Sequence, residues 1–79
     1  MNIEFIDQYH NLFPIVKQLG IKNSATLGFM PEGGFLDHAN KKCIVVAYEE
    51  EQFAGYLMFR VVPRLHRIAI VHLCVHDEF

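Results

Sequence analysis

Three strand-length apolar runs, separated only by short turns, fill the second half of the chain and constrain its fold most strongly. They cover residues 43–49, residues 53–62 and Arg67–Val75, and the last is the most apolar and β-branched segment of the sequence. Runs rich in Val, Ile and aromatic residues favour strands, and such short connections favour antiparallel pairing. We therefore expect a three-stranded antiparallel meander, in which Gly55 marks a bulge or a close approach of a neighbouring backbone.

The first part of the chain has a helical rhythm. Apolar residues at positions 5, 9, 12, 16 and 19 follow steps of three and four, which predicts a helix over residues 3–19 with one apolar face. Asp7 is the candidate N-cap of the helix proper within this stretch, and Gly20 is its candidate left-handed C-terminal residue. Pro14 would remove a hydrogen bond and clash inside a helix, so the helix either kinks there or consists of two short pieces. We expect a kinked helix that packs on a sheet.

A second, shorter helix is expected over residues 31–40. Pro31 suits its first position, whereas Gly33 and Gly34 weaken it. The preceding residues 21–30 contain turn-forming residues and are expected to form a loop. The apolar residues around this junction have two explanations, ordinary packing or one wall of a substrate pocket. They are Leu27, Phe29, Met30 and Phe35.

Composition indicates one folded domain over residues 1–79. The order of the expected elements, two N-terminal helices followed by the meander, makes its class α+β. The chain is 52% hydrophobic and 20% charged, which argues against disorder. A net charge of −2 with scattered Lys and Arg predicts no nucleic-acid partner. No apolar run approaches the roughly 20 residues that cross a bilayer, and the N-terminus does not have the order of a signal peptide. We expect a soluble, cytoplasmic protein.

The spacing of the histidines and cysteines in the sequence favours neither a metal site nor a nucleophilic thiol. Alternation along the last strand places His72, Cys74 and His76 on one face, but side chains two positions apart are separated by about 7 Å. Convergence on one ion is therefore disfavoured, and we predict no metal site. Cys74 does not have the accessible, electropositive setting of a nucleophilic thiol. Together with Cys43 it matches no disulfide framework, so both are expected to be reduced core residues.

Residues 53–60, a turn and residues 70–76 resemble the central strands of the GNAT superfamily of N-acetyltransferases. In that family a strand of the order hydrophobic-x-Gly-aromatic-hydrophobic, here residues 53–57, is followed by a hairpin and a Leu-x-Val strand, here Leu73-Cys74-Val75. The run CIVVAYEEEQ is similar to the family's preceding strand, and the two expected helices have the family's order. The resemblance implies an incomplete GNAT-like fold that stops at Phe79.

The resemblance also implies a cofactor and a site. The backbone of Leu73, Cys74 and Val75 would hydrogen-bond the pantetheine arm of acetyl-CoA, and residues 27–35 would lie on the acceptor side. In the family a basic, glycine-rich turn then opens a helix and binds the pyrophosphate, and later strands complete the sheet. The chain ends before that turn, and no carboxylate lies on Arg67–Val75 to act as general base, so His72 is the remaining candidate. Acetyl transfer to an amine is expected only from a completed fold.

The last strand also predicts self-association. In an incomplete sheet one edge of Arg67–Val75 would be unpaired on an apolar, nearly uncharged strand, which is the profile of a strand that pairs with another chain. We expect a homo-oligomer formed through this strand, edge to edge or by covering the open apolar face. Two other interpretations remain: a non-catalytic small α+β module that binds itself or a partner through the strand, and an unrelated α+β fold.

Overall fold

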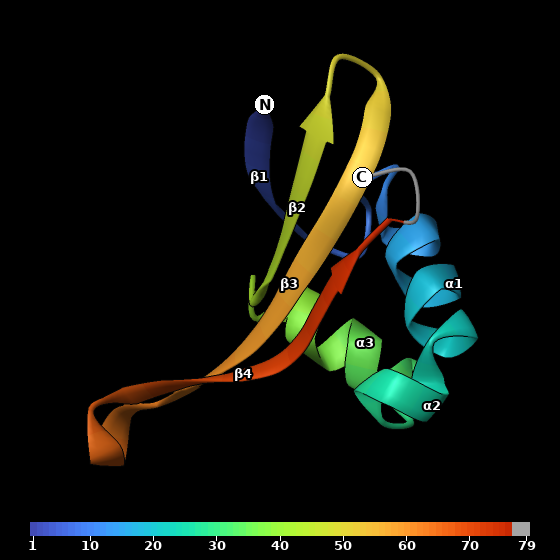
Figure 1. The fold of residues 1–79 in the computed structure, drawn as a ribbon. Coiled ribbons are helices and arrows are strands. Elements are labelled where there is room, and N and C mark those ends of the chain that lie inside the picture. Colours follow the sequence, from blue (N-terminus) through green and yellow to red (C-terminus); the bar gives the residue numbers. More distant parts are fainter. Residues whose placement is uncertain (77–79) are drawn as a thin grey trace.

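The sheet is an antiparallel meander of four strands in the spatial order β1-β2-β3-β4, and the helices lie against one of its faces (Figure 1). The computed structural model describes residues 1–76. The elements in chain order are β1 (Asn2–Ile6), α1 (Phe13–Lys22), α2 (Ser24–Leu27), α3 (Glu32–Asn40), β2 (Ile44–Glu49), β3 (Gln52–Val62), the 3₁₀ helix η1 (Pro63–Leu65) and β4 (Arg67–Val75). The α+β class is confirmed.

The N-terminal residues form a strand, so the predicted helix over residues 3–19 is wrong in its first part. β1 pairs with β2 from Asn2 opposite Tyr48 to Ile6 opposite Ile44. Five residues of period-two alternation fit a strand as well as the first turn of a helix. The pairing settles the choice, because it satisfies backbone groups along an edge of β2 that would otherwise be open.

Helix α1 begins at Phe13, which removes the conflict that Pro14 posed. Pro14 lies in the first two positions of the helix, where its missing N–H has no intrahelical partner to lose, so neither a kink nor a break is needed. Asp7 does not cap the helix: its Oδ1 accepts from the Tyr9 N–H at 2.9 Å in the preceding turn. Gly20 does not end the helix either, because α1 continues to Lys22.

Gly20 serves close packing instead. A Cβ built on it would lie 2.6 Å from Cζ of Phe35 and 2.8 Å from the hydroxyl oxygen of Tyr56, so only glycine lets α1 approach these rings. Residues 21–30, predicted as a loop, contain the single helical turn α2. The second predicted helix is confirmed as α3, with Pro31 as its N-cap residue.

The three predicted strands form an antiparallel meander as β2, β3 and β4, but the sheet has a fourth strand, β1, that was not predicted. Both explanations offered for Gly55 hold. Ala47 pairs with Gly55 and Tyr48 with Phe53, so Ala54 forms a bulge in β3. A Cβ on Gly55 would lie 2.5 Å from the carbonyl oxygen of Cys74, so β4 can pass close to β3 only at a glycine.

The core lies between the helices and the sheet. Its largest fully buried side chains come from every layer and are Phe35, Ile44, Met58, Val16 and Val46. Cys43 and Cys74 are both buried, as predicted, and no disulfide joins them. None of the helices in residues 1–76 is long and apolar enough to cross a membrane.

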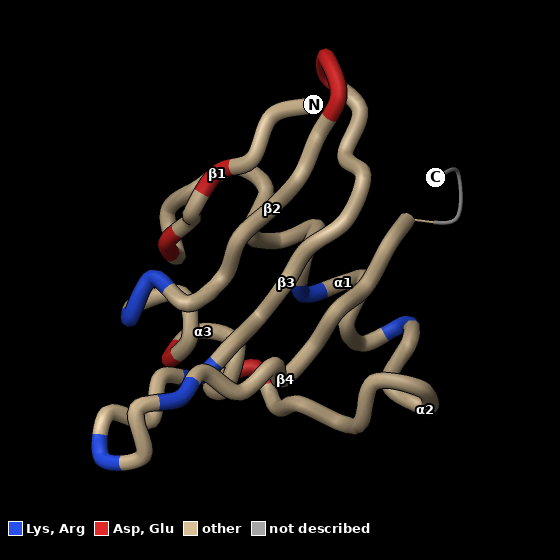
Figure 2. Tube along the Cα trace, turned by 60° about the vertical axis from the view of Figure 1, so that its left-hand side comes forward, with Lys and Arg blue, Asp and Glu red and all other residues tan. Residues whose placement is uncertain are grey.

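Within the sheet, acidic residues lie at the β2–β3 turn and on β1, and Arg residues lie at the opposite end, while further charges lie along the helices (Figure 2). The acidic Glu49, Glu50 and Glu51 lie at the β2–β3 turn, and Glu4 lies on β1. The opposite end, around η1, carries Arg residues of the β3–β4 hairpin.

Candidate functional site

The C-terminal half of β4 lies at an outer edge of the sheet, where alternate backbone groups point away from any described strand. The His76 N–H donates to the Ala54 carbonyl at 2.6 Å, so the backbone groups of His76, and by alternation those of Cys74, point toward β3. Those of Leu73 and Val75 therefore point to the outer edge. No described strand pairs with β4 on that side.

A bulge separates this half of β4 from the half nearer η1. Met58 pairs with His72 and Phe59 with Ile70, which leaves Val71 as an extra residue in β4. A bulge bends its strand and increases the local twist. In Figure 1, β3 and β4 curve together, and their hairpin extends beyond the helices.

The side chains of the predicted cofactor residues alternate between the two faces of the sheet. Cys74 is buried on the helix side, where the Asn23 side-chain amide donates to its Sγ at 3.7 Å. Leu73 and Val75 are 63% and 60% exposed on the other face. A ligand lying along this edge would meet backbone groups in the plane of the sheet and apolar side chains beside them.

His72 and Tyr56 form a buried polar pair directly behind this edge. The Tyr56 hydroxyl oxygen lies 3.1 Å from Nδ1 of His72, and the ring of Phe35 meets that of His72 edge-on at 5.9 Å. His72 is only 3% exposed. Burial lowers its pKa, and nearby His38 lowers it further, whereas a hydrogen bond with the Gly28 backbone acts in the opposite direction. Burial, with a smaller effect of Cys74, raises the pKa of Tyr56 well above its ordinary value.

These polar groups are satisfied within the protein. His38 is buried, and its Nδ1 lies 2.7 Å from the Gly34 carbonyl, to which the ring N–H donates. Among the described residues, no buried side-chain nitrogen or oxygen is without a hydrogen-bond partner. The structure therefore places His72, the candidate base, inside a closed hydrogen-bonded core with its Nδ1 already engaged.

The predicted substrate-side residues divide between core and surface. Phe35 is buried at 1% exposure, Leu27 and Met30 pack at the margin of the core, and Phe29 is 80% exposed. The Gly28 backbone reaches His72, and α2 packs against β4. The junction predicted for the acceptor and the strand predicted for the cofactor therefore lie side by side.

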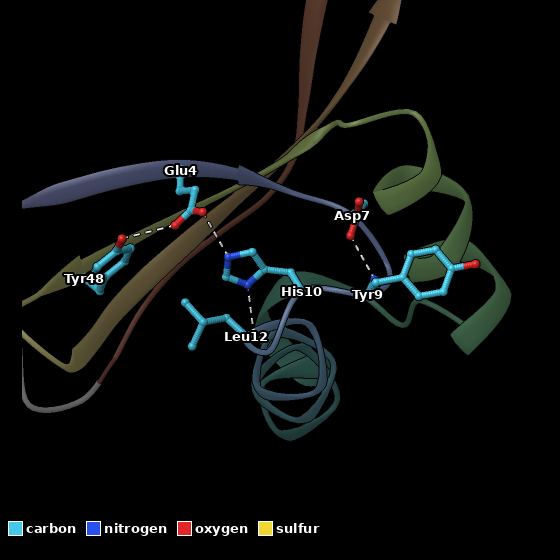
Figure 3. A network of polar contacts seen from close by, with 6 residues as sticks. All are labelled: Glu4, Asp7, Tyr9, His10, Leu12 and Tyr48. Carbon is cyan, nitrogen blue, oxygen red and sulfur yellow. Dashed lines mark hydrogen bonds and ion pairs between the residues drawn. The ribbon is translucent and has the colours of Figure 1, made fainter.

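A second polar arrangement, at the β1 end of the sheet, was missed by sequence reasoning (Figure 3). His10 Nε2 lies 3.2 Å from Oε1 of Glu4, and the Tyr48 hydroxyl donates to Oε2 of the same carboxylate at 3.1 Å. The Leu12 N–H donates to Nδ1 of His10 at 3.0 Å, so a neutral ring carries its proton on Nε2 and donates to Glu4.

This network borders a hollow of about 500 Å³ near the acidic turn. The hydrogen bond to Glu4 raises the pKa of Tyr48. The only signal for it in the sequence was the alternation of residues 2–6, because a strand there brings Glu4 beside Tyr48. Within residues 1–76, no three His, Cys, Asp or Glu side chains are grouped so that they could hold a metal ion.

Comparison of the chain with protein-family models, with curated proteins and with solved structures finds no match in any of the three.

Proposed function

We propose that this chain carries the first portion of a GNAT-type N-acetyltransferase fold, and that the outer edge of β4 at Leu73–Val75 receives the pantetheine arm of acetyl-CoA. The observation that carries the proposal is the direction of the Leu73 and Val75 backbone groups, which point away from β3 beyond a bulge in the strand. The order of helices followed by an antiparallel meander agrees with the resemblance seen in the sequence.

The chemistry of the arm suits such an edge. Pantetheine is an extended chain with two amide groups, and an extended amide chain can hydrogen-bond the free edge of a strand as an added strand does. Leu73 and Val75 offer their N–H and C=O groups to the outer edge, and Cys74 between them directs its groups toward β3. Every second residue of an edge strand is therefore available to an added strand, as in antiparallel pairing. The exposed side chains of Leu73 and Val75 give the methylene groups of the arm an apolar neighbour.

The described residues supply only this part of a transferase site. No glycine-rich turn opening a helix follows β4 within residues 1–76, so these residues provide no cradle of backbone N–H groups for the pyrophosphate. β4 carries no carboxylate, and His72 is enclosed. Transfer of the acetyl group to an amine acceptor therefore needs elements beyond those described.

Titration of the ¹⁵N-labelled chain with pantetheine and with acetyl-CoA, followed by NMR, tests the proposal. We expect both ligands to shift the Leu73 and Val75 amide signals, with similar millimolar affinity because no described group meets the phosphates. The Cys74 amide, which faces β3, should move less, and the Gly33 amide in α3 should not move. Absence of shifts at Leu73 and Val75 up to about 10 mM, which would saturate a millimolar site, would overturn the proposal.

Val75→Pro provides the matched variant. Proline removes an N–H that points to the outer edge and is tolerated on an edge strand, so the sheet should persist. We expect pantetheine binding to weaken at least severalfold. Unchanged binding by a folded Val75→Pro variant would contradict a role of this amide.

A further inference from the structure

The sheet has one covered face and one open face. The helices lie on the side of Val46, Tyr56 and Met58, and register places the alternate residues of every strand on the other side (Figure 1). We call these residues the open face. They are Ile3, Phe5, Val45, Ala47, Gly55, Leu57, Phe59, Val61, Ile68, Ile70, Leu73 and Val75.

The open face is apolar along all strands except at the β2–β3 turn, where the pairing of Glu49 with Gln52 brings two polar residues to the same side. Alternation directs Arg60 and Arg67 to the opposite side, because each lies one position from an open-face residue. At the rim of this face, the N-terminal amine and Glu49 form an ion pair at 3.3 Å, which neutralises the Glu49 charge. A contiguous apolar surface of this kind on a soluble protein marks an interaction site.

Its size fits one partner of a standard interface. Several of its large side chains expose half or more of their surface, namely Ile3, Phe5, Val61, Ile68, Ile70, Leu73 and Val75. Together such side chains offer on the order of 800 Å², which is what each partner contributes to a stable interface.

The shape of the open face favours a second copy of the chain as its binding partner. The small residues Ala47 and Gly55 lie in the middle of a hollow of about 410 Å³, with Ile3 on one border and Leu73 and Val75 on the other. A surface with a trough between apolar ridges can receive the ridges of its own copy across a twofold axis, and two sheets stack face to face in this way.

We propose that two copies of this chain stack through their open faces and form a closed dimer. Each copy has one such face, and in the dimer both faces are covered. A third copy therefore has no open face to bind, and the assembly does not grow into a filament. The backbone groups at the outer edge of β4 stay outside the stack, whereas the Leu73 and Val75 side chains take part in both proposals. The amide-shift titration tests the cofactor site and sedimentation tests the stack, so the failure of one can be told from the failure of the other.

Sedimentation velocity of the 79-residue chain over about 1 to 200 µM tests the stack, a range that covers micromolar dissociation constants. We expect a species of twice the 9.2 kDa chain mass. Leu73→Asp places a charge on an apolar ridge beside the hollow and should weaken the dimer by about 30-fold or more. Ile21→Asp is the matched control, because Ile21 is 57% exposed on α1 whereas Leu73 is 63% exposed on the open face, and it should leave the dimer unchanged.

Ile3→Asp, on the other border of the hollow, gives a second variant in case Leu73→Asp fails to fold, and circular dichroism checks both. A monomer throughout the range would overturn the proposal and would mean that another segment or protein covers the face. A mixture of large aggregates would also overturn it. Edge pairing would replace it if Val75→Pro dissociates the dimer while folded Leu73→Asp and Ile3→Asp variants do not.

Discussion

The hydroxyl oxygen of Tyr56 on β3 lies 3.1 Å from Nδ1 of His72 on β4, and both side chains are buried beneath the helices. The two residues are not direct partners in the sheet, since Tyr56 is opposite Cys74 and Met58 is opposite His72. The hydrogen bond is thus a diagonal link between the strands, at the point where α2 and α3 meet the sheet.

Removing the hydroxyl tests the energetic value of this link. Tyr56→Phe would leave Nδ1 of a buried imidazole without its partner, so we expect a loss of about 1–3 kcal/mol of unfolding free energy in chemical denaturation. Tyr48→Phe is the matched control, because its hydroxyl donates to Glu4 in an exposed setting, and it should cost much less than Tyr56→Phe. Equal losses in the two variants would contradict a special role of the buried pair.

His72 should make stability depend on pH. In the unfolded chain its pKa is near the ordinary 6.5, whereas burial lowers the pKa in the folded protein. The unfolded state therefore binds more protons as pH falls, so the stabilisation is present above pH 6.5 and is lost as pH falls toward the lowered folded value. We expect His72→Gln to flatten the fall in Tm between about pH 7.5 and 5.5.

The control for this pH profile is His66→Asn. His66 is exposed beside η1 with φ at 50°, a conformation that asparagine tolerates, so this variant removes an imidazole without disturbing the core. A His72→Gln profile that runs parallel to that of the wild type would show that other groups govern the pH dependence.

Gly20 and Gly33 should respond in opposite directions to the same substitution. A Cβ at Gly20 would lie 2.6 Å from the Phe35 ring and 2.8 Å from the Tyr56 hydroxyl, so Gly20→Ala should destabilise by about 1–3 kcal/mol despite its gain in helix propensity. Gly33 in α3 has open space around it, so Gly33→Ala should stabilise by about 0.5–1 kcal/mol. Thermal unfolding of both variants measures the difference, and stabilisation by Gly20→Ala would mean that α1 does not pack this closely.

Gly55→Ala should loosen the join between β3 and β4. The added Cβ would meet the Cys74 carbonyl oxygen at 2.5 Å, and a backbone atom cannot yield as a flexible side chain can. We expect a loss above about 2 kcal/mol and faster hydrogen exchange at Cys74 and His76, whose amides face β3. Unchanged exchange at these amides would rule out the close approach.

The meander could be predicted because its signals are local. β4 has the predicted bounds, Arg67–Val75, and β2 and β3 differ from prediction by one residue at their starts. The short turns also fixed the antiparallel direction. Alternation along β4 predicted that the Cys74 side chain lies on one face of the sheet and those of Leu73 and Val75 on the other. It did not predict which of the two faces the helices would cover.

The candidate sites depended on pairings that no local pattern contains. The link from Tyr56 to His72 requires the register of β3 against β4, which the bulge at Val71 shifts by one residue. The contact of Glu4 with Tyr48 requires β1, whose alternation was masked by a helical rhythm continuing through Tyr9 and Leu12.

The sequence by itself determined the three C-terminal strands, their turns and α3, because residues adjacent in the chain decide whether a run is extended or helical. Only the tertiary structure decided that residues 2–6 join the sheet, that Gly20 lies where α1 meets Phe35 and Tyr56, and that one face of the sheet stays open. Each of these depends on backbone groups or side chains far away in the chain, whose positions are set only when the whole domain packs.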